Sequence, residues 1–165
     1  YFFPQPDCNY VLNALRCSRQ IKDKMCEISQ RWQARKNWPK ELFLNTGIHE
    51  GEEWLGTFQA TTSVEFTALG DTINHAARLS DFASHGAIWA TKRLLGKLES
   101  EERREVRYGV YQVGKDARPV FVQSSYARFS SLVDMEQDRH EKLRDIANLP
   151  VAEIVDIRQP GAADF

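Results

Sequence analysis

A stripe of apolar side chains near the N-terminus is the feature that most limits how this chain can fold. Its members follow one another at intervals of three and four residues: Ala14, Cys17, Ile21, Met25, Ile28 and Trp32. This spacing predicts one amphipathic helix, capped by Asp7 or Asn9, running to about Arg35 and ended by the stretch 37–39. Charged residues fill the other faces, so the helix is expected to lie on a sheet rather than in a membrane.

The rest of the chain alternates short strand patterns with short helices. We expect strands at 41–49 and 52–58, paired through a tight turn at Glu50-Gly51, and a third strand at 64–69. A helix should follow from Asp71 or Thr72 to about 85–86, then a buried strand at 87–90 and a helix from Thr91 to Leu98. The C-terminal part predicts a hairpin of 106–113 with 120–123, a helix at 131–147 and a strand at 151–157. Long parallel βαβ spacing is missing from this pattern, which favours an α+β fold.

Composition narrows the class of protein. At 165 residues the chain suits one domain, and its net charge of −1 gives no reason to expect a nucleic-acid surface or a polybasic membrane contact. The sequence has no apolar run near the ~20 residues that span a bilayer. Three cysteines, Cys8, Cys17 and Cys26, form no zinc-ligand pattern and are expected to be reduced thiols, which suits a cytoplasmic protein. Tyr1-Phe2-Phe3 reads as the end of a strand, so we expect the chain to be a piece of a longer protein.

The segment 65–79, EFTALGDTINHAARL, carries the strongest chemical signal. It predicts a strand, a Gly70-Asp71 turn and a helix on which Asn74 and Arg78 lie about one turn apart, on one face. An amide and a guanidinium at the start of a helix can bind a phosphate or a developing oxyanion. An arbitrary pair of this kind is more often a solvated polar face. Here the contact of the helix with the core is expected to come from its apolar residues, Ile73, Ala76, Ala77 and Phe82. Asn74 and Arg78 are then free to face a cleft.

Other polar residues give weaker signals. Thr67, near the end of a strand, has a hydroxyl that suits the edge of a purine, although strand threonines are usually structural. Lys115, at a hairpin tip, could reach a triphosphate, although tip lysines are usually solvated. His49, His75, His85 and His140 form no ligand motif and are taken as non-catalytic, and no metal site is expected within the chain.

The stretch from Asn45 to Thr91 resembles the C-terminal half of the class III nucleotidyl cyclase catalytic domain, the adenylate and guanylate cyclase family. The family pattern is roughly a GI.TGE…G.iG hairpin, a YTviGD.vN.AaRL segment and a.pG.i.vs. The matching positions are Gly47, Ile48, Gly51, Glu52, Gly56, Phe66, Thr67, Gly70, Asp71, Asn74, Ala76, Ala77, Arg78, Leu79, Ala83, Gly86 and Ile88. The first helix and the late hairpin fit more loosely, so the resemblance covers roughly residues 1–125.

The resemblance implies an activity and a set of roles. Family members convert a nucleoside triphosphate to a 3′,5′-cyclic monophosphate and pyrophosphate with two divalent metal ions, here Mg²⁺ or Mn²⁺. Asn74 falls on the family's ribose-orienting asparagine and Arg78 on the arginine that stabilises charge at the α-phosphate. Thr67 falls on the base-selecting position and resembles the threonine-type adenylyl cyclases, so ATP is the expected substrate. The backbone of Ala68 would also face the base, and Lys115 could stand for the triphosphate lysine.

The resemblance also implies that half of the site lies elsewhere. The family's two metal-binding aspartates, and the lysine that pairs with the base-selecting residue, would precede Tyr1, so the ferredoxin-like cyclase fold is expected to be N-terminally incomplete. The family's site forms at a dimer interface, so a homodimer or a cyclase partner through the catalytic face is expected, in a parent that could be membrane-anchored. Residues 126–165 are expected to be an extension with a flexible tail.

Three interpretations therefore remain open. The chain is a fragment of an adenylyl cyclase that is inactive alone, a catalytically incomplete partner of a cyclase, or a ferredoxin-like binding module.

Overall fold

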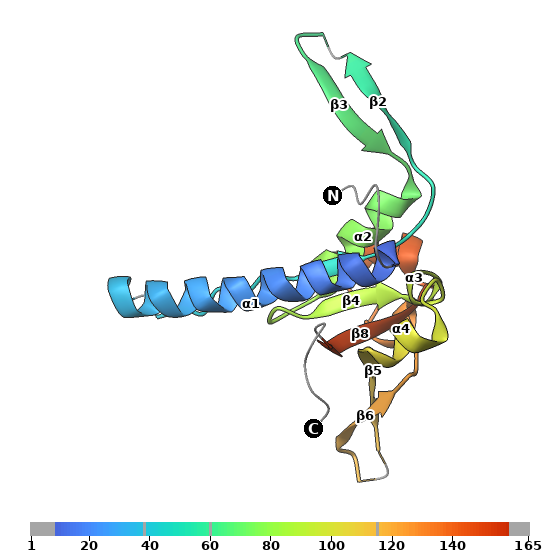
Figure 1. The fold of residues 1–165 in the computed structure, drawn as a ribbon. Coiled ribbons are helices and arrows are strands. Elements are labelled where there is room, and N and C mark those ends of the chain that lie inside the picture. Colours follow the sequence, from blue (N-terminus) through green and yellow to red (C-terminus); the bar gives the residue numbers. More distant parts are fainter. Residues whose placement is uncertain (1–8, 38, 60, 115, 159–165) are drawn as a thin grey trace.

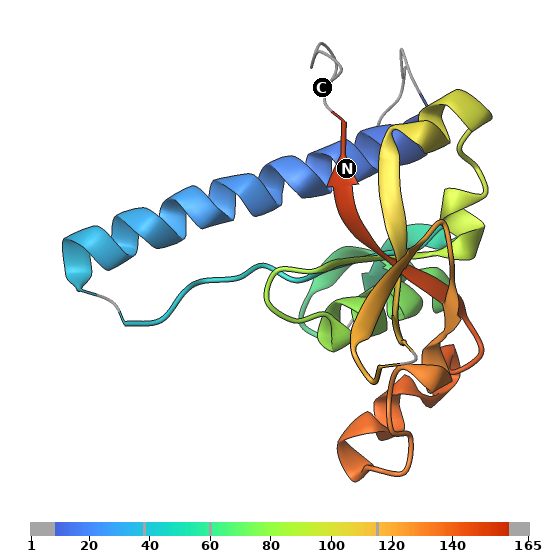
Figure 2. The same cartoon turned by 90° about the horizontal axis from the view of Figure 1, so that it is seen from below.

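The chain folds into one six-stranded sheet with helices on both faces and a separate two-stranded arm (Figures 1 and 2). The computed structural model describes residues 9–37, 39–59, 61–114 and 116–158. The helices are α1 (Tyr10–Lys36), α2 (Asp71–Phe82), α3 (Lys92–Leu95) and α4 (Ser100–Arg104), with 3-10 helices η1 (Phe129–Ser131) and η2 (Asp138–Ile146). The strands are β1 (Thr46–Ile48), β2 (Trp54–Gln59), β3 (Val64–Leu69), β4 (Ile88–Thr91), β5 (Val106–Val113), β6 (Pro119–Gln123), β7 (Ala127–Arg128) and β8 (Pro150–Ile157).

The strand order of the main sheet is β1-β4-β8-β5-β6, with β7 paired to β8. Only the β1–β4 pair is parallel, and the other pairs are antiparallel. The expected α+β class, with an antiparallel-rich sheet covered by helices, is thus confirmed.

Strand β4 shows how the sheet divides the core in two. All four of its residues are buried, and successive side chains point to opposite faces. Ile88 and Ala90 pack with Leu12 and Leu15 of α1, whereas Trp89 packs with Leu79 of α2 on the other face. The candidate helix α2 therefore lies on the face opposite α1.

Helix α1 forms as the apolar spacing predicts. Asn9 caps it, its side-chain oxygen accepting from the Val11 amide at 2.9 Å, and Asn37 ends it in the left-handed region. The burial expected along the stripe is wrong in detail, because the buried apolar contacts come from Val11, Leu12 and Leu15. Trp32 is 51% exposed, since the C-terminal half of the helix extends beyond the sheet (Figure 1).

The pairing expected between 41–49 and 52–58 is wrong. Strand β1 covers only Thr46–Ile48 and pairs with β4, whereas β2 pairs with β3 across the short polar connection that follows it. Helix α2 packs so closely on β1 that a Cβ at Gly47 would collide with the Ala76 carbonyl and the Ser80 amide. The connection after β1 runs to the start of α2, where Thr72 and Ile73 donate hydrogen bonds to Glu52 and Glu53.

The C-terminal part completes the main sheet. Strand β8, close to the predicted 151–157, lies between β4 and β5, and the predicted hairpin appears as β5 and β6. The single helix expected over 131–147 is wrong, because the structure has the two 3-10 segments η1 and η2 there. The apolar residues of this stretch fall into two groups separated by a polar run, so no continuous helical stripe exists.

Candidate active site on helix α2

The start of helix α2 is held by a carboxylate from the connection between β1 and β2. Glu53 Oε1 accepts a hydrogen bond of 2.7 Å from the Ile73 amide, and Glu53 Oε2 is buried without a hydrogen-bond partner among the described residues. Gly70 is the N-cap residue and has no side-chain cap, so the expected cap by Asp71 or Thr72 is wrong. Gly70 has a φ of +157°, which residues with a side chain rarely adopt, and a Cβ there would also collide with the Glu53 carboxylate. The Glu53 carboxylate already accepts a hydrogen bond from the Ile73 amide. An anion bound at this end of α2 would therefore contact side chains of the helix rather than a full set of free backbone amides.

Asn74 and Arg78 lie four residues apart on α2, as predicted, and so share a helix face. The Asn74 side chain is exposed, and that of Arg78 is 30% exposed. Arg78 Nε is buried without a hydrogen-bond partner in the described part of the chain, and the Asp145 carboxylate lies 3.8 Å from it. The core side of the helix differs from the expectation, because Leu79 and Ala83 are buried and Ile73 is 46% exposed.

Thr67 and Ala68 lie on β3, in the two-stranded arm that leads into α2 (Figure 1). Thr67 is opposite Gly56 and Ala68 is opposite Leu55, so their side chains point to opposite faces of the arm. Thr67 is exposed and Ala68 is half-buried. The expected triphosphate residue Lys115 lies outside the described residues. The structure thus brings Asn74 and Arg78 together on one helix and places Thr67 on the strand just before it.

A pair of histidines joins the loop after β1 to helix α2. His49 Nδ1 is 2.8 Å from the buried Thr91 hydroxyl, and His49 Nε2 is 3.5 Å from His75 Nδ1. Burial of the His49 ring, followed by the nearby His75, lowers the pKa of His49 below its usual value of 6.5. His75 directly follows Asn74, so this pair helps to fix the first turn of α2.

Sequence reasoning missed Glu53 and Asp145. Glu53 stands beside the motif residue Glu52, but its bond to Ile73 depends on how the 49–53 loop folds over α2. Asp145 comes from η2, far along the chain, and no spacing in the sequence links it to Arg78. Only tertiary structure could have identified either residue.

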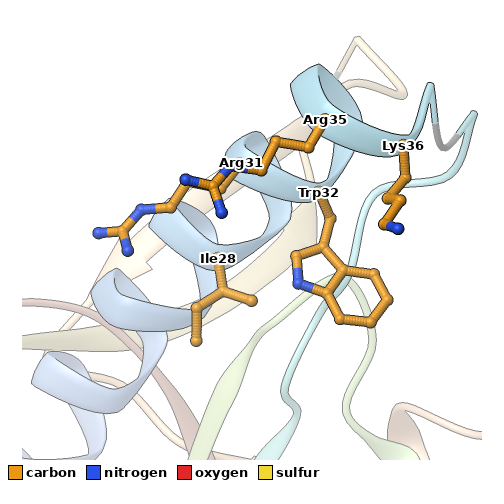
Figure 3. A pocket seen from close by; sticks show the side chains of 5 residues that line it. All are labelled: Ile28, Arg31, Trp32, Arg35 and Lys36. Carbon is orange, nitrogen blue, oxygen red and sulfur yellow. The ribbon is translucent and has the colours of Figure 1, made fainter.

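Two surface hollows lie away from α2. One, of about 300 Å³, is lined by Ile28, Arg31, Trp32, Arg35 and Lys36 of α1 (Figure 3). The other, of about 210 Å³, lies between α1 and the segment 41–44 and includes His85 and Gly86. Neither contains Thr67, Asn74 or Arg78.

The described residues contain no group of three or more His, Cys, Asp or Glu side chains that could hold a metal ion. Cys17 and Cys26 are free thiols. Within the same ranges, helices that combine the length and the apolar character needed to cross a bilayer are not found.

Comparison with solved structures shows where this fold occurs. The adenylyl cyclase CyaB from P. aeruginosa superposes with a TM-score of 0.61 at 18% identity, over 96% of this chain and 66% of that chain. The guanylyl cyclase Cya2 superposes with a TM-score of 0.61 at 13% identity, over 99% of this chain and 67% of that chain. No protein-family model matches the sequence, and neither does any curated protein sequence. The fold is therefore that of nucleotide cyclases, and the chain spans about two thirds of the length of each of these structures.

Proposed function

We propose that this chain is part of an adenylyl cyclase catalytic domain, which converts ATP to 3′,5′-cyclic AMP and pyrophosphate. The observation that carries the proposal is the position of Asn74 and Arg78 on one face of α2, directly after the arm, in a fold shared with two cyclases. The chain supplies the polar pair that binds the reacting ribose and phosphate.

The two side chains do different work in the proposed reaction. The 3′-hydroxyl of the ribose attacks the α-phosphorus, and negative charge builds up on the phosphate oxygens as pyrophosphate leaves. The Arg78 guanidinium donates hydrogen bonds to that charge, and the Asn74 amide holds the ribose so that its hydroxyl is in line. Preorganised donors of this kind typically contribute about 10²-fold or more each to the rate.

The divalent metal ions of such a reaction would supply charge neutralisation at the phosphates. The described residues do not form a site for them, so no step of this proposal depends on a metal held by this chain. We expect the ligands for Mg²⁺ or Mn²⁺ to come from residues outside the chain.

ATP is the proposed substrate because of Thr67. Its exposed hydroxyl can both donate and accept a hydrogen bond at the edge of a purine, and the choice of adenine rests on the resemblance of this position to the threonine-type adenylyl cyclases. The two structural neighbours do not decide this point, since one is an adenylyl and the other a guanylyl cyclase.

Exposed apolar side chains on the two-stranded arm favour the presence of a second subunit in the complete site. Trp54 is 83% exposed and Phe66 is 69% exposed, although an isolated hairpin is rarely stable without packing on one face. Large exposed apolar side chains beside a candidate site are typical of an interface. We propose that a second copy or a cyclase partner covers the arm and brings the metal-binding residues to α2. The same observation favours a second candidate function, a catalytically incomplete partner that lends Asn74 and Arg78 to another cyclase.

Complementation tests the proposal. The 165-residue chain is mixed with a cyclase chain that carries the metal-binding aspartates but has its own asparagine and arginine replaced. Cyclic AMP should form from ATP and Mn²⁺ only in the mixture. If the chain alone formed cyclic AMP, the expectation that it carries only half of the site would be contradicted. If neither the chain alone nor the mixture formed cyclic AMP, the binding-module interpretation would be favoured.

A further inference from the structure

The C-terminal segment places a carboxylate beside Arg78. Asp145, in η2, has its Oδ2 3.8 Å from Arg78 Nε, which is closer than any other carboxylate found near this guanidinium among the described residues. This distance allows an ion pair but is too long for a hydrogen bond. Arg78 Nε is therefore a buried donor with an acceptor nearby and no bond made.

The backbone around Asp145 is firmly held. Leu143 and Ile146, on either side of it, are buried in the cluster that contains Leu79 of α2. Asp145 Oδ1 accepts a hydrogen bond of 3.0 Å from the Ile146 amide, which leaves Oδ2 toward Arg78. Because α2 and η2 share this core, the two charged groups are set against each other by apolar packing rather than by their own attraction.

The contact engages one side of the guanidinium only. The ion-pair contact of Asp145 is with Nε, and Nε is the atom of Arg78 that is buried without a hydrogen-bond partner among the described residues. If the Asp145 carboxylate moved close enough to bond Nε, it would fix the plane of the guanidinium and leave the terminal nitrogens to face a phosphate. A buried donor without a hydrogen bond is unfavourable, so a small movement that closes the 3.8 Å gap is favoured.

We propose that Asp145 is a positioning residue, which orients Arg78 for binding the phosphate chain. This inference rests on the proposed function. It gives the C-terminal segment, which lies outside the resemblance, a part in the candidate site: η2 carries the carboxylate that fixes the arginine. If Asp145 instead competed with phosphate for Arg78, removal of its charge would strengthen phosphate binding rather than weaken it.

The first test needs no catalysis. In ¹H–¹⁵N spectra of the whole chain, the Arg78 Nε–H signal is assigned from its loss in Arg78→Lys. Asp145→Asn should shift this signal and speed its hydrogen exchange several-fold. Asp81→Asn is the matched control, because it removes an exposed carboxylate from α2, the helix that carries Arg78. An unchanged Arg78 signal in Asp145→Asn would overturn the inference.

Titration with inorganic pyrophosphate, followed by the same signal, tests the direction of the effect. Exposed and half-exposed ion pairs contribute up to about 1 kcal/mol, so Asp145→Asn should weaken binding by up to about fivefold. Asp145→Glu should restore most of the affinity. Tighter binding by Asp145→Asn would mean competition and would overturn the proposal. Unchanged binding together with a lower melting temperature would show a purely structural role and would overturn it too.

The complementation assay separates this inference from the proposed function. If the mixture makes cyclic AMP and Asp145→Asn leaves kcat and KM unchanged, the positioning role fails while the cyclase function stands. If the mixture is inactive but pyrophosphate binding weakens in Asp145→Asn, the cyclase function fails while the positioning of Arg78 for an anion stands.

Discussion

Glu53 Oε1 accepts a hydrogen bond of 2.7 Å from the backbone amide of Ile73, and this contact joins the loop before the arm to the first turn of α2. Like an N-cap side chain, Glu53 satisfies a backbone amide in the first turn of the helix. The carboxylate also lies at the N-terminal, positive end of the helix dipole. Asn74 lies in the same turn, so a residue of the preceding loop anchors the backbone next to it.

Replacing Glu53 should loosen this end of the helix. Loss of a helix-capping side chain usually costs about 1 kcal/mol, so Glu53→Ala should lower the free energy of unfolding in urea by about that amount. Glu52→Ala is the control, because the Glu52 side chain is exposed and only its carbonyl contacts Thr72. It should stay within about 0.5 kcal/mol of the original chain. Equal losses in the two variants would refute the capping role.

Gly47 and Gly56 make a matched pair of glycines. A Cβ at Gly47 would collide with α2 and would lie only 2.7 Å from Leu79 Cβ, whereas a Cβ at Gly56 meets nothing within 4 Å. Gly47→Ala should therefore destabilise the fold by about 1–3 kcal/mol through overpacking. Gly56→Ala should be neutral or slightly stabilising, because alanine restricts the unfolded chain. Urea denaturation of both variants tests this, and a tolerated Gly47→Ala would mean that α2 packs less closely on β1.

Stability should fall at mildly acidic pH because of His49. Burial lowers the pKa of His49 in the folded chain below 6.5, so the unfolded chain binds the proton more readily. This contribution is fully present above pH 6.5 and is lost as the pH falls through the lowered pKa of the folded state. His49→Gln should give a shallower decline in the free energy of unfolding between neutral pH and about pH 5. An unchanged slope in His49→Gln would count against this account.

The apolar arm should decide whether subunits associate. Phe66 is 69% exposed on the arm, and Val113, at the far hairpin, is 80% exposed. If the arm is covered by another subunit, Phe66→Ser should weaken association by about tenfold or more in sedimentation equilibrium, as for a central aromatic contact. Val113→Ser should leave association unchanged. Similar effects of the two substitutions would indicate nonspecific sticking rather than an interface.

The sequence predicts local structure well where one pattern dominates. The spacing along α1, the Asn9 cap, the apolar run of β4 and the β5–β6 hairpin are visible from neighbouring residues alone. Asn74 and Arg78 share a face because helical periodicity requires it. These features depend on local sequence, and the structure reproduces them.

Most of the failures involve partners that are distant in the chain, although the cap of α2 and the helix expected over 131–147 are local errors. The sequence does not show that β2 pairs with β3 instead of β1, because both pairings fit a short connection. The placement of β8 inside the sheet, the binding of Glu53 to Ile73 and the approach of Asp145 to Arg78 result from tertiary packing. The candidate pair could thus be found from sequence, but the residues that hold it could not.

The central claim is that Asn74 and Arg78 act on the reacting nucleotide, and complementation with single variants tests it most directly. Asn74→Ala and Arg78→Ala are each mixed with the metal-bearing partner chain and compared with Ser84→Ala, an exposed position just beyond α2. The account predicts that each site variant lowers the rate of cyclic AMP formation by about 10²-fold or more while Ser84→Ala retains full activity. Undiminished activity of Asn74→Ala and Arg78→Ala, in a mixture that depends on this chain, would contradict it.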